Sequence, residues 1–318
     1  AWLDANENSR INLYNRYPDP LQMAVKEKLA MLRGVDPASI FLGVGSDECI
    51  DIAYRVFCRP GVDNVLAIEP TYGMYKVCAD INDVEYRCVE LDTDFRIDTE
   101  RLLAAADANT KLLWLCSPNN PTGNAYEPEQ LIAIAERFNG ITIVDEAYVD
   151  FSTKGSVVSA IATHPRLIVM QTLSKAWASA AIRLGIAYAS PEIIEIYNKV
   201  KYPYNVNELT QRQAIRILED ADHVTHVVHE LVDARMQLTA ELAMLPDVLH
   251  IYPSDANFLL MKVTDANGIY AFLRDNGVIV RNRSRVTGCE DCIRVTVGTD
   301  EENRLLIQKL TEYGNMRR

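Results

Sequence analysis

A lysine follows a short apolar run near the middle of the chain. Residues 167–170 are Leu, Ile, Val and Met, and the polar turn behind them ends on Lys175. A short continuous apolar run is typical of a buried strand, and open α/β sheets bind ligands beyond the carboxyl ends of their strands. A partly desolvated lysine there can stay neutral and attack a carbonyl group, whereas a solvated loop lysine would do no chemistry.

Polar side chains also follow four other predicted strands. These turns contain Ser46 with Asp47, Tyr72, Asn120, and Asp145 with Tyr148, while Ser174 precedes Lys175 and Arg183 follows it by eight residues. Because strands and helices alternate along this part of the chain, we expect a mainly parallel sheet whose strand ends share one edge. The sequence therefore predicts that these side chains face one crevice.

The residue types in this crevice are those that a pyridoxal phosphate site needs. Lys175 would form a Schiff base with the cofactor aldehyde. Asp145 would keep the pyridine nitrogen protonated, so that the ring can take electrons from a substrate carbanion. Tyr148 and Asn120 are placed to hydrogen-bond the phenolic oxygen, and Tyr72 offers a flat face for stacking on the ring.

The phosphate of the cofactor would lie where residues 43–48 turn into a helix. Free N–H groups and the helix dipole make such a place an anion site. The predicted phosphate contacts are Ser46, the N–H groups of Asp47 and Glu48, Thr172, Ser174 and Arg183. Ser46 or Asp47 could instead merely cap the helix, and this segment alone leaves both interpretations open.

The elements that must position these residues form a doubly wound α/β arrangement. We expect strands at 40–44, 65–68, 84–89, 111–116, 141–148, 167–170 and 184–189, and helices at 20–33, 49–58, 98–106, 128–138 and 191–201. Pro20 is expected to open the first helix and Gly34 to end it.

After residue 205 the pattern changes to that of a smaller α+β domain. A long helical stretch at 207–244, broken near 219–223, precedes strands at 248–252, 257–263, 278–281 and 292–297 and helices at 266–275 and 301–313. We predict an N-terminal segment at 1–17, a large cofactor-binding domain at 18–205 and a small domain at 206–318.

Length and composition limit the classes of protein that this chain can be. With 318 residues and 48% hydrophobic content it suits about two domains. No apolar run exceeds five residues, so we expect no membrane span, and the net charge of −12 argues against nucleic acid as a partner. Seven scattered cysteines and an opening unlike a signal peptide predict a reducing, cytoplasmic setting.

Several motifs resemble those of known enzymes. Residues 117–123, 145–148, 172–175 and 183–185 resemble the fold-type I aminotransferases, and the thirty-residue interval from Asp145 to Lys175 fits that family. More narrowly, residues 3–8, 15–18, 70–75 and 294–298 are similar to the histidinol-phosphate aminotransferase family. The resemblance covers nearly the whole chain, and the order and spacing of the motifs carry it.

The resemblance implies a fold, a reaction and roles for residues. The fold would be a mostly parallel seven-stranded sheet with helices on both faces plus a smaller α+β domain, assembled as a homodimer. The reaction would be transamination between histidinol phosphate and 2-oxoglutarate, giving glutamate. Lys175 would also shuttle protons, and Tyr17 would reach the cofactor phosphate of the neighbouring subunit. Substrate would contact Asn6, Asn120, Arg281 and Arg294.

Two departures from the family pattern stand out. The chain begins almost directly at residues 3–6, so the usual N-terminal arm, with its dimer contacts and one tyrosine on the substrate side, would be missing. Ala178 stands where the family usually carries glycine. If that position has a positive φ, alanine strains the loop that carries Lys175.

Other interpretations remain open. A threonine-phosphate decarboxylase or a general aromatic aminotransferase would share most of this site, and a non-catalytic pyridoxal phosphate sensor is a third class. Arg281, Arg283, Arg285 and Arg294 form the densest basic cluster, which fits a phosphorylated substrate or a solvated strand edge. Cys289 and Cys292, and the three histidines at 223, 226 and 229, have metal-like spacing but no complete ligand set, so no metal site is predicted.

Overall fold

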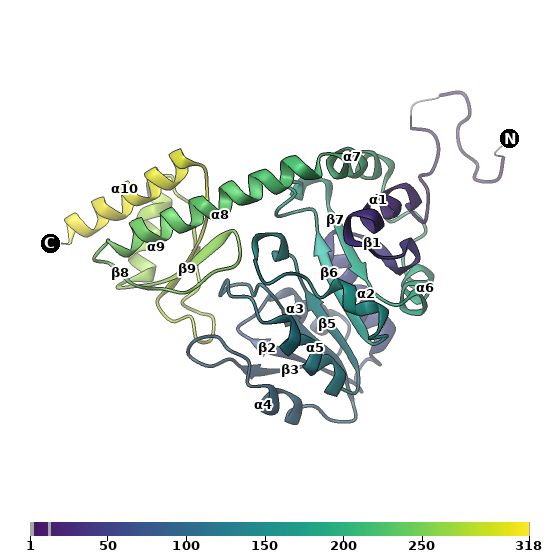
Figure 1. Ribbon diagram of the computed structural model, residues 1–318, viewed down its shortest axis with the longest axis horizontal. Helices are drawn as coiled ribbons and strands as arrows, with labels where there is room; N and C mark the ends of the chain where they lie inside the picture. The colour runs from purple at the N-terminus through teal and green to yellow at the C-terminus, as the bar shows by residue number, and fades with distance from the viewer. Residues whose placement is uncertain (1–2, 12–13, 318) are drawn as a thin grey trace.

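The computed structural model describes residues 3–11 and 14–317, and it divides into a large and a small unit (Figure 1). A seven-stranded sheet forms the centre of the large unit, in the order β1-β7-β6-β5-β4-β2-β3. The strands are β1 (Ile40–Val44), β2 (Asn64–Glu69), β3 (Glu85–Glu90), β4 (Thr110–Cys116), β5 (Ile141–Asp145), β6 (Leu167–Thr172) and β7 (Leu184–Tyr188). β7 runs antiparallel to both neighbours, and the other paired strands are parallel. The predicted fold is confirmed.

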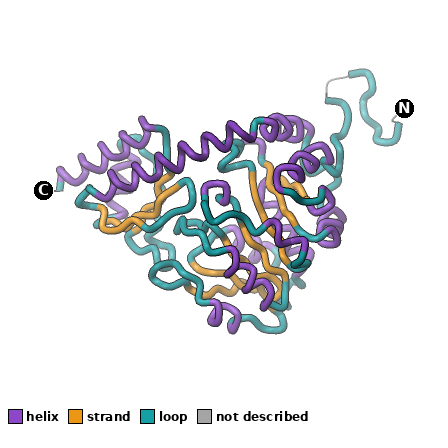
Figure 2. Tube along the Cα trace, in the orientation of Figure 1, coloured by secondary structure: helices purple, strands orange, loops and turns teal. Residues whose placement is uncertain are grey.

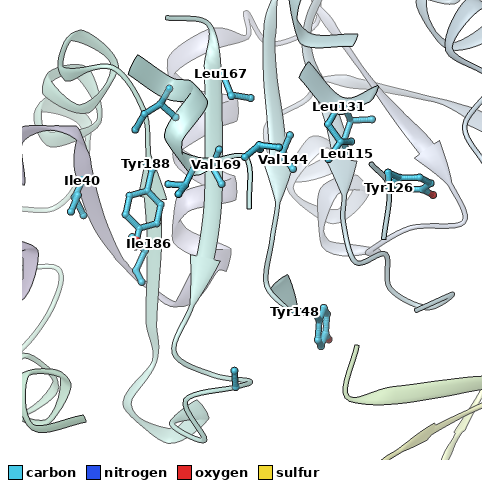
Figure 3. Close-up of a cluster of buried hydrophobic side chains, with 14 of the residues drawn as sticks. Ile40, Leu115, Tyr126, Leu131, Val144, Tyr148, Leu167, Val169, Ile186 and Tyr188 are labelled. Carbon is cyan, nitrogen blue, oxygen red and sulfur yellow. The ribbon is translucent and has the colours of Figure 1, made fainter. Parts of the chain in front are cut away.

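Helices cover both faces of this sheet (Figure 2). They are α1 (Met23–Arg33), α2 (Gly45–Phe57), α3 (Met74–Ile81), α4 (Thr99–Ala104), α5 (Pro128–Arg137) and α6 (Pro191–Val200), with short 3-10 helices η1 (Pro37–Ser39), η2 (Val149–Phe151), η3 (Val158–Ala162) and η4 (Ala180–Ile182). Alternate residues of β4 serve two cores, since Leu113 and Leu115 pack on one face and Leu112 and Trp114 on the other. Figure 3 shows part of the first core across neighbouring strands.

Several predicted boundaries were wrong: α2 begins at Gly45 rather than residue 49, and β10 is Arg281–Asn282 rather than 278–281. Two further boundaries have identifiable local reasons. α1 begins at Met23 rather than Pro20, because the carboxylate of Asp19 accepts hydrogen bonds from the N–H groups of Leu21 and Met23 and holds a turn there. Gln22 then adopts a left-handed φ of 53°. The strand expected at 141–148 ends at Asp145, which brings that carboxylate to the edge of the sheet.

The small unit is built on an antiparallel sheet in the order β10-β11-β9-β8. Its elements are α8 (Ala221–Ala243), β8 (Val248–Ile251), β9 (Phe258–Val263), α9 (Ala266–Asp275), β10 (Arg281–Asn282), β11 (Cys292–Thr296) and α10 (Asp300–Met316). α7 (Glu208–Glu219) precedes α8, and the break between them at Asp220 lies inside the predicted region.

The two units share α8, which runs from one to the other (Figure 1). Its Val228 packs in the core of the large sheet, together with Leu218 of α7, whereas Leu238 and Leu242 pack in the core of the small unit. We therefore propose that the predicted division at residues 205 and 206 lies further along the chain, within α8. None of the described helices is long and apolar enough to cross a membrane.

The described part of the N-terminal segment extends away from the large unit (Figures 1 and 2). Its Tyr17 stacks on Tyr204, with ring centroids 4.3 Å apart, while remaining largely exposed. Within the segment, the carboxylate of Glu7 accepts hydrogen bonds from the N–H of Tyr17 and from the guanidinium of Arg16. The segment thus has internal order although it covers little of its own subunit.

Candidate active site

A cavity of about 770 Å³ lies at the carboxyl ends of the strands, between the two units. Residues from β5, β6, the starts of α2 and α3, and β10 and β11 of the small unit contribute to its walls. Twelve of the predicted site residues line it: Ser46, Asp47, Tyr72, Asn120, Asp145, Tyr148, Thr172, Ser174, Lys175, Arg183, Arg281 and Arg294. Positions spread over about 250 residues of sequence therefore meet in one place, as the strand-end argument predicted.

Three predicted site residues do not line this cavity. The carboxylate of Glu48 accepts hydrogen bonds from the N–H of Val44 and the amide of Asn205, so it is directed toward these residues of its own subunit and not into the cavity. Its own N–H belongs to the hydrogen-bonded part of α2, because only the first turn of a helix has free donors. Tyr17 and Asn6 lie in the N-terminal segment, outside the cavity of their own subunit.

The start of α2 can hold an anion. The helix begins at Gly45, whose N–H donates to the carbonyl of Arg183 at 2.8 Å. No side chain caps the helix, so the alternative that Ser46 or Asp47 merely caps it is not what the structure has. The N–H groups of Ser46 and Asp47 lie in the first turn, where donors lack partners within the helix. They are available to a phosphate group.

Arg183 completes this end of the cavity. It adopts a left-handed φ of 55°, and its Nη2 lies 3.2 Å from Oδ2 of Asp47. A Cβ atom on Gly45 would stand 2.6 Å from the same Nη2, so only glycine lets the guanidinium lie over the helix start. Thr172 Oγ1 accepts a hydrogen bond from the N–H of Ser174 at 3.1 Å, and this turn brings the hydroxyl groups of Thr172 and Ser174 together.

Asp145 is a buried carboxylate at the floor of the cavity, only 3% exposed. Its Oδ2 accepts from the hydroxyl of Tyr75 at 2.7 Å, and its Oδ1 accepts from the N–H of Ala147 at 3.1 Å. Burial raises the pKa of Asp145 above its ordinary value, although the hydrogen bond from Tyr75 opposes that shift. No cationic side chain of the described residues forms an ion pair with it. A protonated ring nitrogen would supply that missing charge.

Tyr75 is the site residue that the sequence analysis missed. It lies beneath the cavity lining, fully buried, with its ring stacked on Trp114 at 4.6 Å. Its closeness in sequence to Tyr72, which lies just before α3, was the available signal. The two tyrosine rings meet edge to face at 5.6 Å.

Lys175 reaches into the open cavity from the turn after β6. Partial burial lowers the pKa of its amine, and the nearby charge of Arg294 lowers it further. Its Nζ lies 5.5 Å from the ring centre of Tyr148. Tyr148 in turn packs edge to face on Phe258 of β9, beyond the ends of the large sheet (Figure 3). Both the partial burial and the neighbouring cation thus favour the neutral amine over the ammonium form.

Four arginines form the wall that the small unit contributes, and we call this set the arginine wall: Arg281, Arg283, Arg285 and Arg294. Arg281 and Arg294 are paired across β10 and β11. Arg294 Nη1 donates to Oδ1 of Asn120 at 2.5 Å, and burial and Arg283 together lower its pKa. None of the four has a carboxylate within salt-bridge distance in the described part of the chain, which is unusual in an acidic protein.

The turn after Lys175 is strained where the sequence suggested. Ala178 has a φ of 48°, in the left-handed region that glycine adopts freely. For alanine this conformation costs roughly 1–2 kcal/mol. The N–H of Ala178 donates to the carbonyl of Lys175 at 3.0 Å, so the strained residue closes the turn on the lysine.

The remaining motifs lie outside the cavity. Cys289 and Cys292 are buried free thiols that pack with Phe95 and Leu260, and the three histidines at 223, 226 and 229 lie along α8. Among the described residues there is no group of three or more His, Cys, Asp or Glu side chains that could hold a metal.

The residues present fit pyridoxal phosphate. Free N–H groups, hydroxyls and Arg183 form an anion cradle, and a buried carboxylate without a cationic partner lines the same cavity as the lysine. A doubly wound sheet with this arrangement at its carboxyl edge defines a fold-type I pyridoxal phosphate enzyme.

Comparison with known proteins narrows this class. Residues 1–310 match the family described as aminotransferase class I and II. A histidinol-phosphate aminotransferase of Parabacteroides distasonis is 51% identical over 310 residues, which cover 98% of this chain and 90% of that protein. One of Bacteroides fragilis is 53% identical over 313 residues, covering 98% and 91%. The chain belongs to the aminotransferase class I and II family, among its histidinol-phosphate aminotransferases.

The fold is also that of solved relatives. The crystal structure of histidinol-phosphate aminotransferase from Sinorhizobium meliloti in complex with pyridoxal-5'-phosphate matches with a TM-score of 0.88, at 24% identity, over 95% of this chain and 84% of that one. At this identity the likeness concerns the fold, and the relatives at 51% and 53% carry the assignment to the family.

Proposed function

We propose that this protein transfers the amino group of histidinol phosphate to 2-oxoglutarate, with pyridoxal phosphate as cofactor and glutamate as a product. The observation that carries the substrate proposal is the arginine wall, which presents four guanidinium groups to the cavity without a carboxylate partner. A phosphate monoester carries nearly two negative charges, and guanidinium groups bind such a group through paired hydrogen bonds.

Several residues of the cavity would hold the cofactor. Ser46, Asp47 and Arg183, with Thr172 and Ser174, would hold the cofactor phosphate, and Tyr72 would pack on its ring. When bound, the cofactor supplies an aldehyde and a ring that takes up the electrons released when a bond of the substrate carbon breaks.

The remaining residues would hold or transfer protons. Asp145, ionised, would hold a proton on the ring nitrogen, and Tyr148 and Asn120 would donate hydrogen bonds to the phenolic oxygen. Lys175 Nζ, whose neutral form is favoured by burial and by Arg294, would accept the proton from the substrate carbon and return it to the carbon of the cofactor aldehyde.

We further propose that the active enzyme is a homodimer of the cytoplasm. Tyr17 and Asn6 lie on a segment that leaves its own subunit, which supports a contact with a neighbour's cavity. The seven cysteines are free thiols, which suits a reducing compartment.

A product assay tests the proposed reaction against its alternatives. The holoenzyme, given histidinol phosphate and 2-oxoglutarate, should form glutamate. Given threonine phosphate, it should release little carbon dioxide. Carbon dioxide release without glutamate would instead identify a decarboxylase, equal rates with aromatic amino acids would identify a general aminotransferase, and a bound cofactor without turnover would identify a sensor.

A further inference from the structure

The carboxylate proposed to hold the ring nitrogen is itself held by a tyrosine outside the cavity. Tyr75 donates its hydroxyl to Asp145 Oδ2 at 2.7 Å, and both side chains are buried. Tyr75 also supports the edge of Tyr72, at 5.6 Å between ring centres. Asp145 and Tyr72, which are predicted to contact different parts of the cofactor, therefore both contact Tyr75.

The position of Tyr75 is fixed by an aromatic stack. Its ring lies against Trp114 of β4 at 4.6 Å and an angle of 14°, and Tyr54 of α2 lies against the same indole at 5.6 Å and 22°. The hydroxyl of Tyr54 donates to the backbone carbonyl of Tyr75 at 2.7 Å. The donor to Asp145 thus has little freedom to turn away.

We propose that Tyr75 is a positioning residue of the reaction: its hydroxyl orients Asp145 and keeps it ionised, so that this carboxylate can hold a proton on the ring nitrogen. The inference rests on the proposed role of Asp145. Physically, a charge-assisted hydrogen bond favours the ionised form of a buried acid, whereas burial alone favours the neutral form.

Other titratable groups also surround Asp145, and removal of the Tyr75 hydroxyl leaves them in place, although the thiol of Cys116 also interacts with that hydroxyl. Asp47 raises the pKa of Asp145 and Lys175 lowers it. The further ionisable neighbours are Cys49 on α2, Tyr72 just before α3, Cys116 on β4 and Tyr148 after β5. A comparison of Tyr75 variants therefore tests chiefly the hydrogen bond to Asp145.

The test is the pH dependence of the holoenzyme carrying Tyr75→Phe, which keeps the ring and loses the donor. Without the donor the pKa of Asp145 rises, so the fraction ionised falls on the acid side. The acid limb of kcat should move to higher pH by about one to two pH units, and the deficit should shrink as pH increases. Release of the cofactor during dialysis at pH 6 should become about tenfold faster, since the pairing with its ring nitrogen weakens.

Tyr54→Phe is the matched control. It removes one buried hydroxyl hydrogen bond from the same aromatic stack but has no contact with Asp145. It should lower the stability of the protein and leave the acid limb in place. An equal movement of the limb in both variants would mean that loosened packing causes it, and an unmoved limb in Tyr75→Phe would overturn the proposal.

Replacement of Tyr75 by 3-fluorotyrosine gives a second test, which also serves if the phenylalanine variant does not fold. The fluorinated phenol donates a stronger hydrogen bond from the same place, so the acid limb should lie no higher than in the wild-type enzyme. A limb raised in this variant would contradict the role of the donor. Failure of the proposed role of Asp145 itself is distinguishable, because Asp145→Asn would then retain turnover.

Discussion

The cofactor side of the cavity and the arginine wall differ in whether their charged side chains have fixed partners. On the cofactor side, Asp145 is fixed by Tyr75 and Ala147, and Arg183 by Asp47. In the arginine wall, no guanidinium group forms an ion pair with any described residue. Burial lowers the pKa of Arg283 and of Arg294, and the charge of Arg281 lowers both further. The first arrangement suits a cofactor that stays bound, and the second suits anionic substrates that exchange.

The largest effect should come from the cofactor side, with Lys175→Ala. Removal of the amine eliminates both the covalent attachment and the proton carrier, so transamination should fall by about 10⁴-fold or more. Borohydride treatment of the wild-type holoenzyme should fix the cofactor to Lys175, which peptide mapping can check. A label on any other lysine would show that the cofactor side has been misassigned.

Asp145→Asn should have the next largest effect. An amide cannot hold a proton on the ring nitrogen, so turnover should fall by about 10²–10³-fold, while some cofactor stays bound through its phosphate. Cofactor content is measured by absorbance and turnover by glutamate formation. Near wild-type turnover in the variant would remove this carboxylate from the mechanism.

A smaller effect is expected from Tyr17→Phe, which tests whether the cofactor side is completed by a neighbouring subunit. Loss of one hydrogen bond to a phosphate should weaken cofactor binding by about tenfold or more without unfolding the chain. Mixed with Lys175→Ala subunits, it should regain partial activity, since one site of a mixed dimer then carries neither change. No recovery in confirmed mixed dimers would place Tyr17 at its own subunit's site.

The smallest effect concerns the strained turn on the cofactor side. Ala178→Gly should relieve a left-handed alanine and stabilise the holoenzyme by about 1 kcal/mol, seen as a higher midpoint of urea unfolding. The control Ala176→Gly, at a buried position in the same turn, should destabilise it. A drop in stability with Ala178→Gly would mean that its φ carries no strain.

The sequence was sufficient to locate both sides of the cavity. Strand ends follow from apolar runs, and the polar residues directly behind them had to share one edge of the sheet. The break between α7 and α8 was also expected, and Ala178 was named as a position that would be strained if its φ were positive. These features depend on local chain chemistry, which a sequence displays.

Features that depend on particular side-chain hydrogen bonds and on tertiary contacts were not predicted. The start of α1 was misplaced because the side chain of Asp19 holds a turn beyond Pro20. The N–H of Glu48 was assigned to the cofactor phosphate because the helix was expected to begin at residue 49, whereas α2 begins at Gly45. Tyr75 was passed over because its partner is 70 residues distant and only the folded sheet brings them together.

The most direct test of the account compares substrates in wild-type and Arg281→Ala holoenzyme. Removing one guanidinium from the arginine wall should lower kcat/KM for histidinol phosphate by about ten- to a hundredfold, and much less for glutamate, because the phosphate carries more charge than the carboxylate. Arg294→Ala should damage both half-reactions, since its guanidinium would receive either anion. Equal losses for histidinol phosphate and glutamate in Arg281→Ala would contradict selection for a phosphorylated amine.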